Sequence, residues 1–133
     1  MRVMALDWGK RRIGVAVSDE LGIAAHGLRT LARTTKRQDI ETLIGLIRER
    51  NIETVVVGDP LHLSGAKSGS SSQAARFAFQ LGRHAGIPVE MWDERLTSWE
   101  AENILGTSPK DPGEIDRLAA VILLESYLAA KQS

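Results

Sequence analysis

Residues 3–18 read VMALDWGKRRIGVAVS and contain two short apolar runs separated by a turn. The first run ends at Asp7, and its residues alternate with the two-residue period of a β-strand. A glycine-containing turn follows, and the second run, Ile13–Ser18, predicts another strand. With a third strand predicted at Ala25–Leu31, the amino-terminal part of the chain is expected to form an antiparallel meander.

The pattern changes to alternating helices and strands in the middle of the chain. Apolar residues recur at helical spacing over Gln38–Arg50, and Gln73–Ala85 is also predicted to be helical. Each helix precedes an apolar strand, the first at Thr54–Val57 and the second at Val89–Asp93. The run at Thr54–Val57 is β-branched and apolar without alternation, which is typical of a parallel strand buried on both faces.

The last third of the chain is predicted to be mainly helical. A capping box at Thr97–Glu100 opens a short helix that runs to Leu105, and Ile115–Ala130 predicts a long apolar helix. Two stretches rich in Gly, Ser or Pro, Leu61–Ser72 and Thr107–Gly113, are expected to be the most mobile loops and to close on substrate. The order predicts one α/β domain over residues 1–133, with a mixed five-stranded sheet and helices on both faces.

The composition excludes several classes of protein. The chain has no cysteine, which rules out disulfides, thiolate zinc sites and cysteine nucleophiles. No apolar run reaches the roughly 18–20 residues that a membrane helix needs, and the first residues lack the pattern of a signal peptide. We therefore expect a cytoplasmic protein without a membrane partner.

Basic residues are concentrated in the first part of the chain although the net charge is zero. Residues 1–50 hold ten Lys or Arg against six Asp or Glu. Such clusters can bind phosphates. The alternative interpretation is that they belong to a solvated surface of mixed charge. The candidate nucleic-acid-binding residues are Lys10, Arg11, Arg12, Arg33, Lys36 and Arg37.

Three acidic residues occupy unusual positions. Asp7 ends the first predicted strand, and Asp93-Glu94 ends the last. In open α/β sheets, ligands bind at the carboxyl ends of the strands. Asp116 begins the last helix and shares a helical face with apolar residues, so its carboxylate should point toward the protein body. The alternative for Asp116 is a simple interaction with the helix dipole.

Together these carboxylates predict a metal site. Clustered carboxylates repel one another unless a cation neutralises them, and all-oxygen ligands suit Mg²⁺ or Mn²⁺. We expect Asp7, Glu94 and Asp116 to be both ligands and catalytic residues, with Asp7 central and Asp59 as an additional candidate ligand. Such a site activates water and stabilises the leaving oxygen in phosphodiester cleavage.

Four motifs resemble one known family. They are ALDWGKRRIGVA at residues 5–16, VVGDPL at 56–61, WDERLTS at 92–98 and IDRLAAVILL at 115–124. In this order and spacing they resemble the YqgF/RuvX proteins almost from end to end. The resemblance implies an RNase H-like fold related to Holliday-junction resolvases, and a role in maturing the 5′ end of the 16S ribosomal RNA precursor. It also places the family's acidic residues on Asp7, Glu94 and Asp116.

The sequence departs from that family at two positions. Asp59 stands where the family usually has leucine, and the loop Lys110–Glu114 is acidic on balance where the family is often basic. Several readings stay open: a nuclease acting on precursor rRNA, a resolvase of branched DNA, a non-catalytic nucleic-acid or ribosome-binding module, and an actin-like or sugar-kinase-like nucleotide-binding domain. Ribosomal particles are a further expected partner, and the chain is expected to be a monomer or a weak homodimer.

Overall fold

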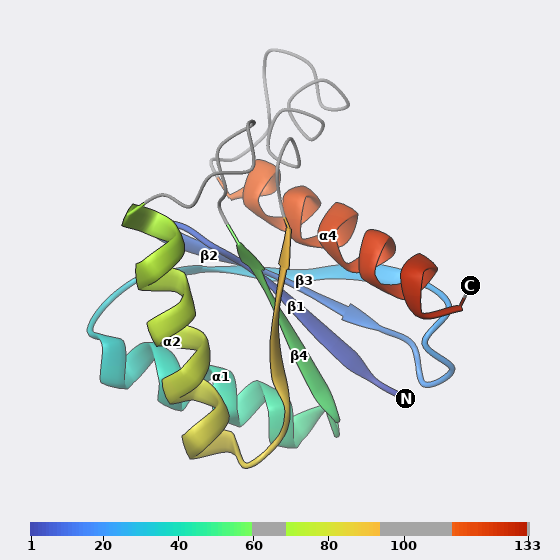
Figure 1. Ribbon diagram of the computed structural model, residues 1–133, viewed down its shortest axis with the longest axis horizontal. Helices are drawn as coiled ribbons and strands as arrows, with labels where there is room; N and C mark the ends of the chain where they lie inside the picture. Colours follow the sequence, from blue (N-terminus) through green and yellow to red (C-terminus); the bar gives the residue numbers. More distant parts are fainter. Residues whose placement is uncertain (60–68, 94–112, 133) are drawn as a thin grey trace.

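A computed structural model describes residues 1–59, 69–93 and 113–132 of the chain (Figure 1). The strands in these parts form one five-stranded sheet, as the sequence predicted, and helices pack against both of its faces. The elements in chain order are β1 (Val3–Trp8), β2 (Arg12–Ser18), β3 (Ala25–Ala32), α1 (Lys36–Glu49), β4 (Thr54–Asp59), α2 (Gly69–Ala85), β5 (Val89–Asp93) and α4 (Glu114–Gln132).

The sheet has the order β3-β2-β1-β4-β5 and combines both strand directions. The first three strands pair with one another in antiparallel fashion, which confirms the predicted meander. β1 also pairs in parallel with β4, and β4 with β5. The opening strand therefore lies at the centre of the sheet, between β2 and β4.

Alternation along the strands divides the core into two layers. On one face, residues such as Met4 and Leu6 pack with Leu43 of α1 and Phe77 of α2. On the other face, Val3 and Ala5 pack against α4. Figure 1 shows α1 and α2 on one side of the sheet and α4 on the other. Because both faces are covered, Val55–Val57 of β4 is fully buried without alternation.

Some predicted boundaries were wrong. α2 begins at Gly69, so Gly69–Ser72, which was assigned to a loop, forms the first turn of this helix. Serine is tolerated there because the first turn of a helix needs few intrahelical hydrogen bonds. β4 continues to Asp59 because its last residues pair with β5. The predicted helix that ends at Leu105 and most of the two predicted mobile loops lie outside the described residues.

α1 begins two residues earlier than predicted, at a cap formed by a threonine. The Thr35 hydroxyl accepts a hydrogen bond from the backbone N–H of Gln38 at 3.1 Å, which is the standard role of an N-cap residue. No helix in the described ranges is both long and apolar enough to cross a membrane.

Candidate active site

Asp7 is held near the end of the central strand. Its backbone pairs with Gly14 of β2, and the residue is only 8% exposed. Val3 and Ala5, which precede it on the same face of β1, pack against α4. The Asp7 carboxylate therefore leaves the sheet on the α4 side. A strand hydrogen-bonded on both sides is a rigid mount for a catalytic group.

Gly14 brings the first turn of α4 against the sheet at the position opposite Asp7. A Cβ atom at Gly14 would lie 2.0 Å from the carbonyl oxygen of Asp116 and 2.4 Å from its carbonyl carbon, so a side chain there is excluded. Antiparallel partners lie about 4.5–5.5 Å apart between their Cα atoms. The backbones of Asp7 and Asp116, from opposite ends of the chain, are thus neighbours across Gly14.

The Asp116 side chain faces the protein and is paired with Arg12. Arg12 Nε donates to Asp116 Oδ2 at 2.7 Å, and the Asp116 side chain is 20% exposed. Ala119 and Ala120 on the same helix are fully buried, so the predicted inward face of α4 is confirmed. The sequence suggested a cation for this carboxylate; among the described residues, Arg12 supplies one.

Arg33 makes contacts within the protein rather than extending into solvent. Its guanidinium lies 4.4 Å from the ring centroid of Trp8, a cation–π contact. Its Nη1 donates to the carbonyl oxygens of Gly9 and Lys10 at 3.0 and 3.3 Å. Arg33 therefore stabilises the β1–β2 turn, while its predicted role in phosphate binding stays a prediction.

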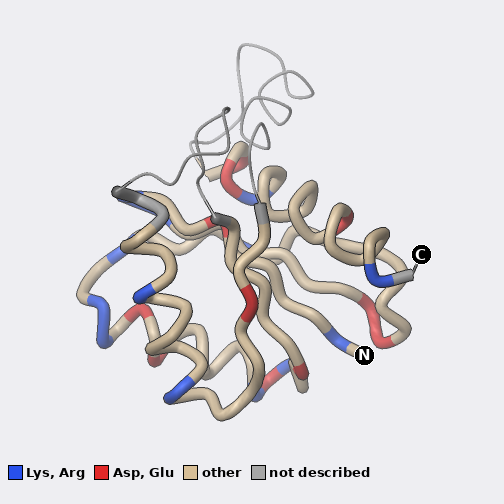
Figure 2. The backbone as a smooth tube through the Cα atoms, in the orientation of Figure 1, with Lys and Arg blue, Asp and Glu red and all other residues tan. Residues whose placement is uncertain are grey.

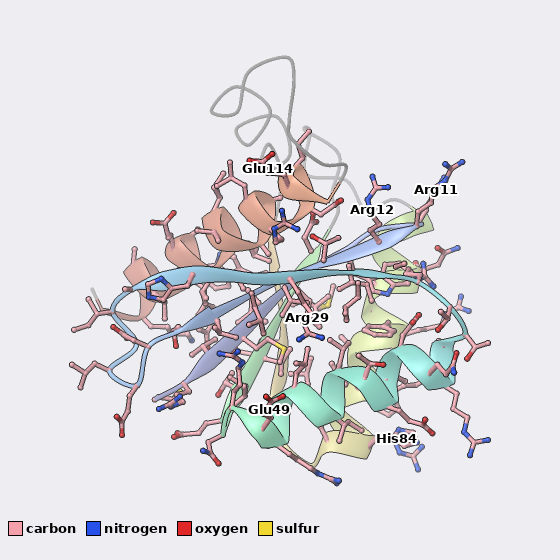
Figure 3. The ribbon with its side chains drawn as sticks, turned by 180° about the vertical axis from the view of Figure 1, so that it is seen from behind. Arg11, Arg12, Arg29, Glu49, His84 and Glu114 are labelled. Carbon is pink, nitrogen blue, oxygen red and sulfur yellow. The ribbon has the colours of Figure 1, made fainter. Side chains whose placement is uncertain are left out.

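The other predicted basic residues lie on the surface. Lys10 and Arg11 are exposed on the β1–β2 hairpin, and Lys36 and Arg37 are exposed at the start of α1. Figure 3 shows Arg11 and Arg12 extending from the end of the sheet beside which α4 begins, near Glu114. Arg37 Nε also pairs with Glu41 at 3.3 Å. The hairpin thus presents positive charge next to the Asp7–Asp116 pair.

The remaining predicted ligands are not described by the structure. Glu94 lies outside the described residues, as does the side chain of Asp59, whose backbone ends β4 beside Asp93. Within the described ranges, no group of three or more His, Asp or Glu side chains is placed to hold a metal ion. The site that the structure shows therefore consists of Asp7, Asp116 and Arg12.

β5 places its even-numbered residues on the α4 side. Tyr127 of α4 donates its hydroxyl to Glu90 Oε2 at 2.5 Å, and Trp92 Nε1 donates to Ser126 Oγ at 3.2 Å. Burial, together with the hydrogen bond and the charge of Glu90, raises the pKa of Tyr127 to about 12. These contacts fasten α4 to the edge of the sheet that leads toward position 94.

Two structural residues of the site region escaped the sequence analysis. Gly14 interrupts an apolar strand, and a glycine in that position signals a close backbone approach. Asp39, at 4% exposure, accepts hydrogen bonds from the backbone N–H and hydroxyl of Thr34 at 3.0 and 3.1 Å. Its signal was an acidic residue in the first turn of a predicted helix, where a carboxylate is favourable.

Comparison with solved structures agrees with this fold. The structure of T. thermophilus RuvC in complex with a Holliday junction substrate aligns with a TM-score of 0.61 and 18% identity. The alignment covers 100% of this chain and 96% of that chain. At this identity the similarity concerns the fold alone, and it confirms the RNase H-like architecture.

Sequence comparison identifies the family. Two bacterial relatives carry the name "Putative pre-16S rRNA nuclease". The one from Koribacter versatilis is 50% identical, covering 96% of this chain and 86% of the relative. The one from Syntrophus aciditrophicus is 45% identical, covering 98% and 89%. The family model of RuvX, described as "Holliday junction resolvase", matches residues 1–130. The chain therefore belongs to the RuvX family.

Proposed function

We propose that this protein is a metal-dependent nuclease that cleaves phosphodiester bonds in the 16S ribosomal RNA precursor. The observation that carries the proposal is the meeting of Asp7 and Asp116 across Gly14, on one face of the sheet and at the carboxyl end of its central strand. Relatives named for pre-16S rRNA nuclease activity and the resolvase-like fold support the same chemistry.

The carboxylates of Asp7 and Asp116 fit a hard divalent cation. Both are oxygen donors on the α4 side of the sheet, and one is buried and the other mostly so. Oxygen ligands of this kind hold Mg²⁺ or Mn²⁺. When bound, such an ion supplies an activated water and stabilises the leaving oxygen. Asp7 would be the central ligand, since it has the more rigid mount.

Glu94 is proposed as the third ligand. Glu90 and Trp92 of β5 contact α4, and if the two-residue alternation continued beyond β5 it would place Glu94 on the same side. Asp93 would then fall on the opposite side and have a structural role. Asp59, at the end of the neighbouring strand, stays a candidate additional ligand.

Arg12 would orient Asp116 and offset its charge. Two carboxylates on one face repel each other, and the 2.7 Å contact from Arg12 reduces that repulsion. Lys10 and Arg11, exposed on the same hairpin, would contact substrate phosphates. Because such contacts release counterions, substrate affinity should fall as salt rises. We expect this cleavage to take place in the cytoplasm, on free precursor rRNA or on ribosomal particles. The protein is expected to act as a monomer or a weak homodimer.

The test is metal-dependent cleavage of matched substrates by wild type and Asp7→Asn. The panel holds RNA spanning the 5′ end of mature 16S rRNA, unrelated RNA of equal length, and a four-way DNA junction. We expect Mg²⁺- or Mn²⁺-dependent cleavage of the precursor RNA and a loss of at least about a hundredfold in the variant.

The other outcomes would contradict the proposal in distinct ways. Preferential cleavage of the junction would make the protein a DNA resolvase. Binding without cleavage at any metal concentration would make it a non-catalytic module. Circular dichroism and thermal melting of Asp7→Asn serve as controls that the variant is folded.

A further inference from the structure

A groove lies between α1 and α2, on the face of the sheet away from α4. Its volume is about 750 Å³, within the roughly 300–1,000 Å³ of pockets that hold small ligands. The residues that line it are Lys36, Arg37, Ile40, Glu41, Ile44, Gln80, Arg83 and His84. The groove is thus large enough to hold a nucleotide, and it is separate from the Asp7–Asp116 site.

The groove carries an excess of positive charge. Lys36, Arg37 and Arg83 line it, and its one lining acid, Glu41, is paired with Arg37 at 3.3 Å. The sequence continues this imbalance along α2, because residues 60–89 contain no Asp or Glu at all. A surface of this kind favours an anionic partner.

The outer face of α2 places an aromatic side chain between two arginines. Arg76, Phe79 and Arg83 follow one another at spacings of three and four residues, so they share one helical face. All three are exposed, and Phe79 is 66% exposed. A single exposed Phe is unremarkable by itself. An exposed ring flanked by guanidinium groups beside a basic groove is a stacking platform for nucleobases.

One end of the groove lies close in the chain to a contact with the hairpin, because Lys36 lines the groove and Arg33, three residues earlier, donates to the carbonyl oxygens of Gly9 and Lys10. In Figure 3, Arg11 and Arg12 at the tip of the hairpin and His84 near the end of α2 appear on one side, at opposite ends. Figure 2 shows basic positions along the edge formed by α1 and α2. A flexible anionic chain could therefore extend from the hairpin to the groove.

We propose that the α1–α2 groove and the adjoining face of α2 bind single-stranded RNA, holding a part of the substrate that is not being cleaved. Lys36, Arg37 and Arg83 contact its phosphates, and Phe79 stacks on a base. That this strand belongs to the substrate rests on the proposed function, whereas binding itself does not require cleavage.

The observations favour single-stranded RNA over two other occupants. In an A-form duplex the bases are stacked and inaccessible to a side chain on a helix face, whereas unpaired bases can stack on Phe79. A second copy of this chain in a two-fold dimer would place the same surface against itself. Like charges in Lys36, Arg37 and Arg83 would then face each other, which is unfavourable.

The experiment measures binding of a labelled, unstructured single-stranded RNA by fluorescence anisotropy, in EDTA so that no cleavage occurs. The variants are Phe79→Ala and Arg83→Gln, which alter only exposed side chains of α2. Phe79→Ala should weaken binding roughly fivefold or more, since one stacked base contributes at least about that factor. Arg83→Gln should also weaken binding, because it removes a phosphate contact. Arg83→Gln should also reduce the slope of log affinity against log salt by about 0.7.

Matched controls separate this groove from general surface effects. Arg48→Gln removes an exposed arginine from the last turn of α1, as Arg83→Gln does from the last turn of α2. Leu21→Ala removes an apolar side chain that is 76% exposed elsewhere. Both controls should bind within about twofold of wild type. Binding of duplex RNA of the same sequence should be weakened by Arg83→Gln but changed little by Phe79→Ala.

Three results bear on the proposal. Wild-type affinity for single-stranded RNA in Phe79→Ala and Arg83→Gln would overturn it. The proposal would also be overturned if sedimentation showed that these substitutions convert a dimer to a monomer while the RNA affinity per monomer stays unchanged. The groove and the adjoining face of α2 would then join two copies of the chain. If wild type binds RNA through these residues but cleaves no substrate, the proposed nuclease function fails and this inference stands.

Discussion

At the scale of single residues, the site depends on how each carboxylate is held. Asp7 is fixed by the backbone of a central strand, whereas the side chain of Asp116 is oriented by its contact with Arg12. The first restraint cannot be removed without disturbing the sheet, but the second can be removed by substitution. Arg12 is therefore the residue through which orientation can be tested separately from folding.

Arg12→Gln should reduce cleavage while hardly affecting stability. The Arg12 side chain is 41% exposed, so its ion pair with Asp116 contributes no more than about 1 kcal/mol to the free energy of unfolding. Loss of orientation and charge compensation should lower kcat about tenfold or more, and Arg12→Lys should restore part of it. Urea unfolding and steady-state kinetics measure the two effects. If the loss of kcat were explained by the loss of folded protein, Arg12 would have only a structural role.

The raised pKa of Tyr127 predicts that the protein loses stability at alkaline pH. Its folded-state pKa of about 12 lies above its ordinary value of 10.0, chiefly because the hydroxyl is buried. The protonated form is favoured in the folded state, so this stabilisation is complete below about pH 10 and is lost as the pH rises from 10 to 12. The loss should reach about 2–3 kcal/mol, and unfolding of Tyr127→Phe should lack that part of the pH dependence. An identical alkaline profile for wild type and Tyr127→Phe would contradict the assignment.

At the scale of elements, the docking of α4 on the sheet builds the site. Its first turn is fastened to β3, where the Thr30 hydroxyl donates to the Gly113 carbonyl oxygen at 2.6 Å. A Cβ atom at Gly113 would lie 2.7 Å from Thr30 Cβ. Together with the close approach at Gly14, this fixes where Asp116 stands. Small residues on both sides of the contact thus set the geometry of the acidic pair.

Gly14→Ala should displace α4 and impair the site. The new methyl group would overlap the backbone of Asp116, so the helix must shift, at a cost of roughly 2–3 kcal/mol in the free energy of unfolding. Cleavage should fall by more than the fraction unfolded explains, since Asp116 moves relative to Asp7.

Gly45→Ala is the control, made in α1 where a Cβ meets nothing within 4 Å. It should stabilise the protein by about 0.5–1 kcal/mol, because alanine is the better helix former. Chemical denaturation measures the stability of both variants, and cleavage assays measure their activity. A Gly14→Ala protein with wild-type stability and activity would show that the close contact is unimportant.

At the scale of the whole molecule, local patterns predicted the architecture well and the side-chain partners poorly. Alternation in β1 and the unbroken apolar run in β4 were enough to predict a mixed sheet with both faces covered. The start of α2 was missed because glycine and serine are compatible with both a loop and a first helical turn. The pairs Arg12–Asp116 and Arg33–Trp8 join distant parts of the chain, and no local pattern encodes such contacts.

We propose that Asp7, Glu94 and Asp116 share one metal ion. Isothermal titration calorimetry tests this sharing directly by measuring the Mn²⁺ affinity of wild type, Asp7→Asn, Glu94→Gln and Asp116→Asn. Glu49→Gln, an exposed acidic residue on α1, is the control. We predict that each of the three site variants loses most of the affinity, Asp7→Asn the most, and that Glu49→Gln binds like wild type. Wild-type Mn²⁺ affinity in Asp7→Asn and Asp116→Asn would contradict the account.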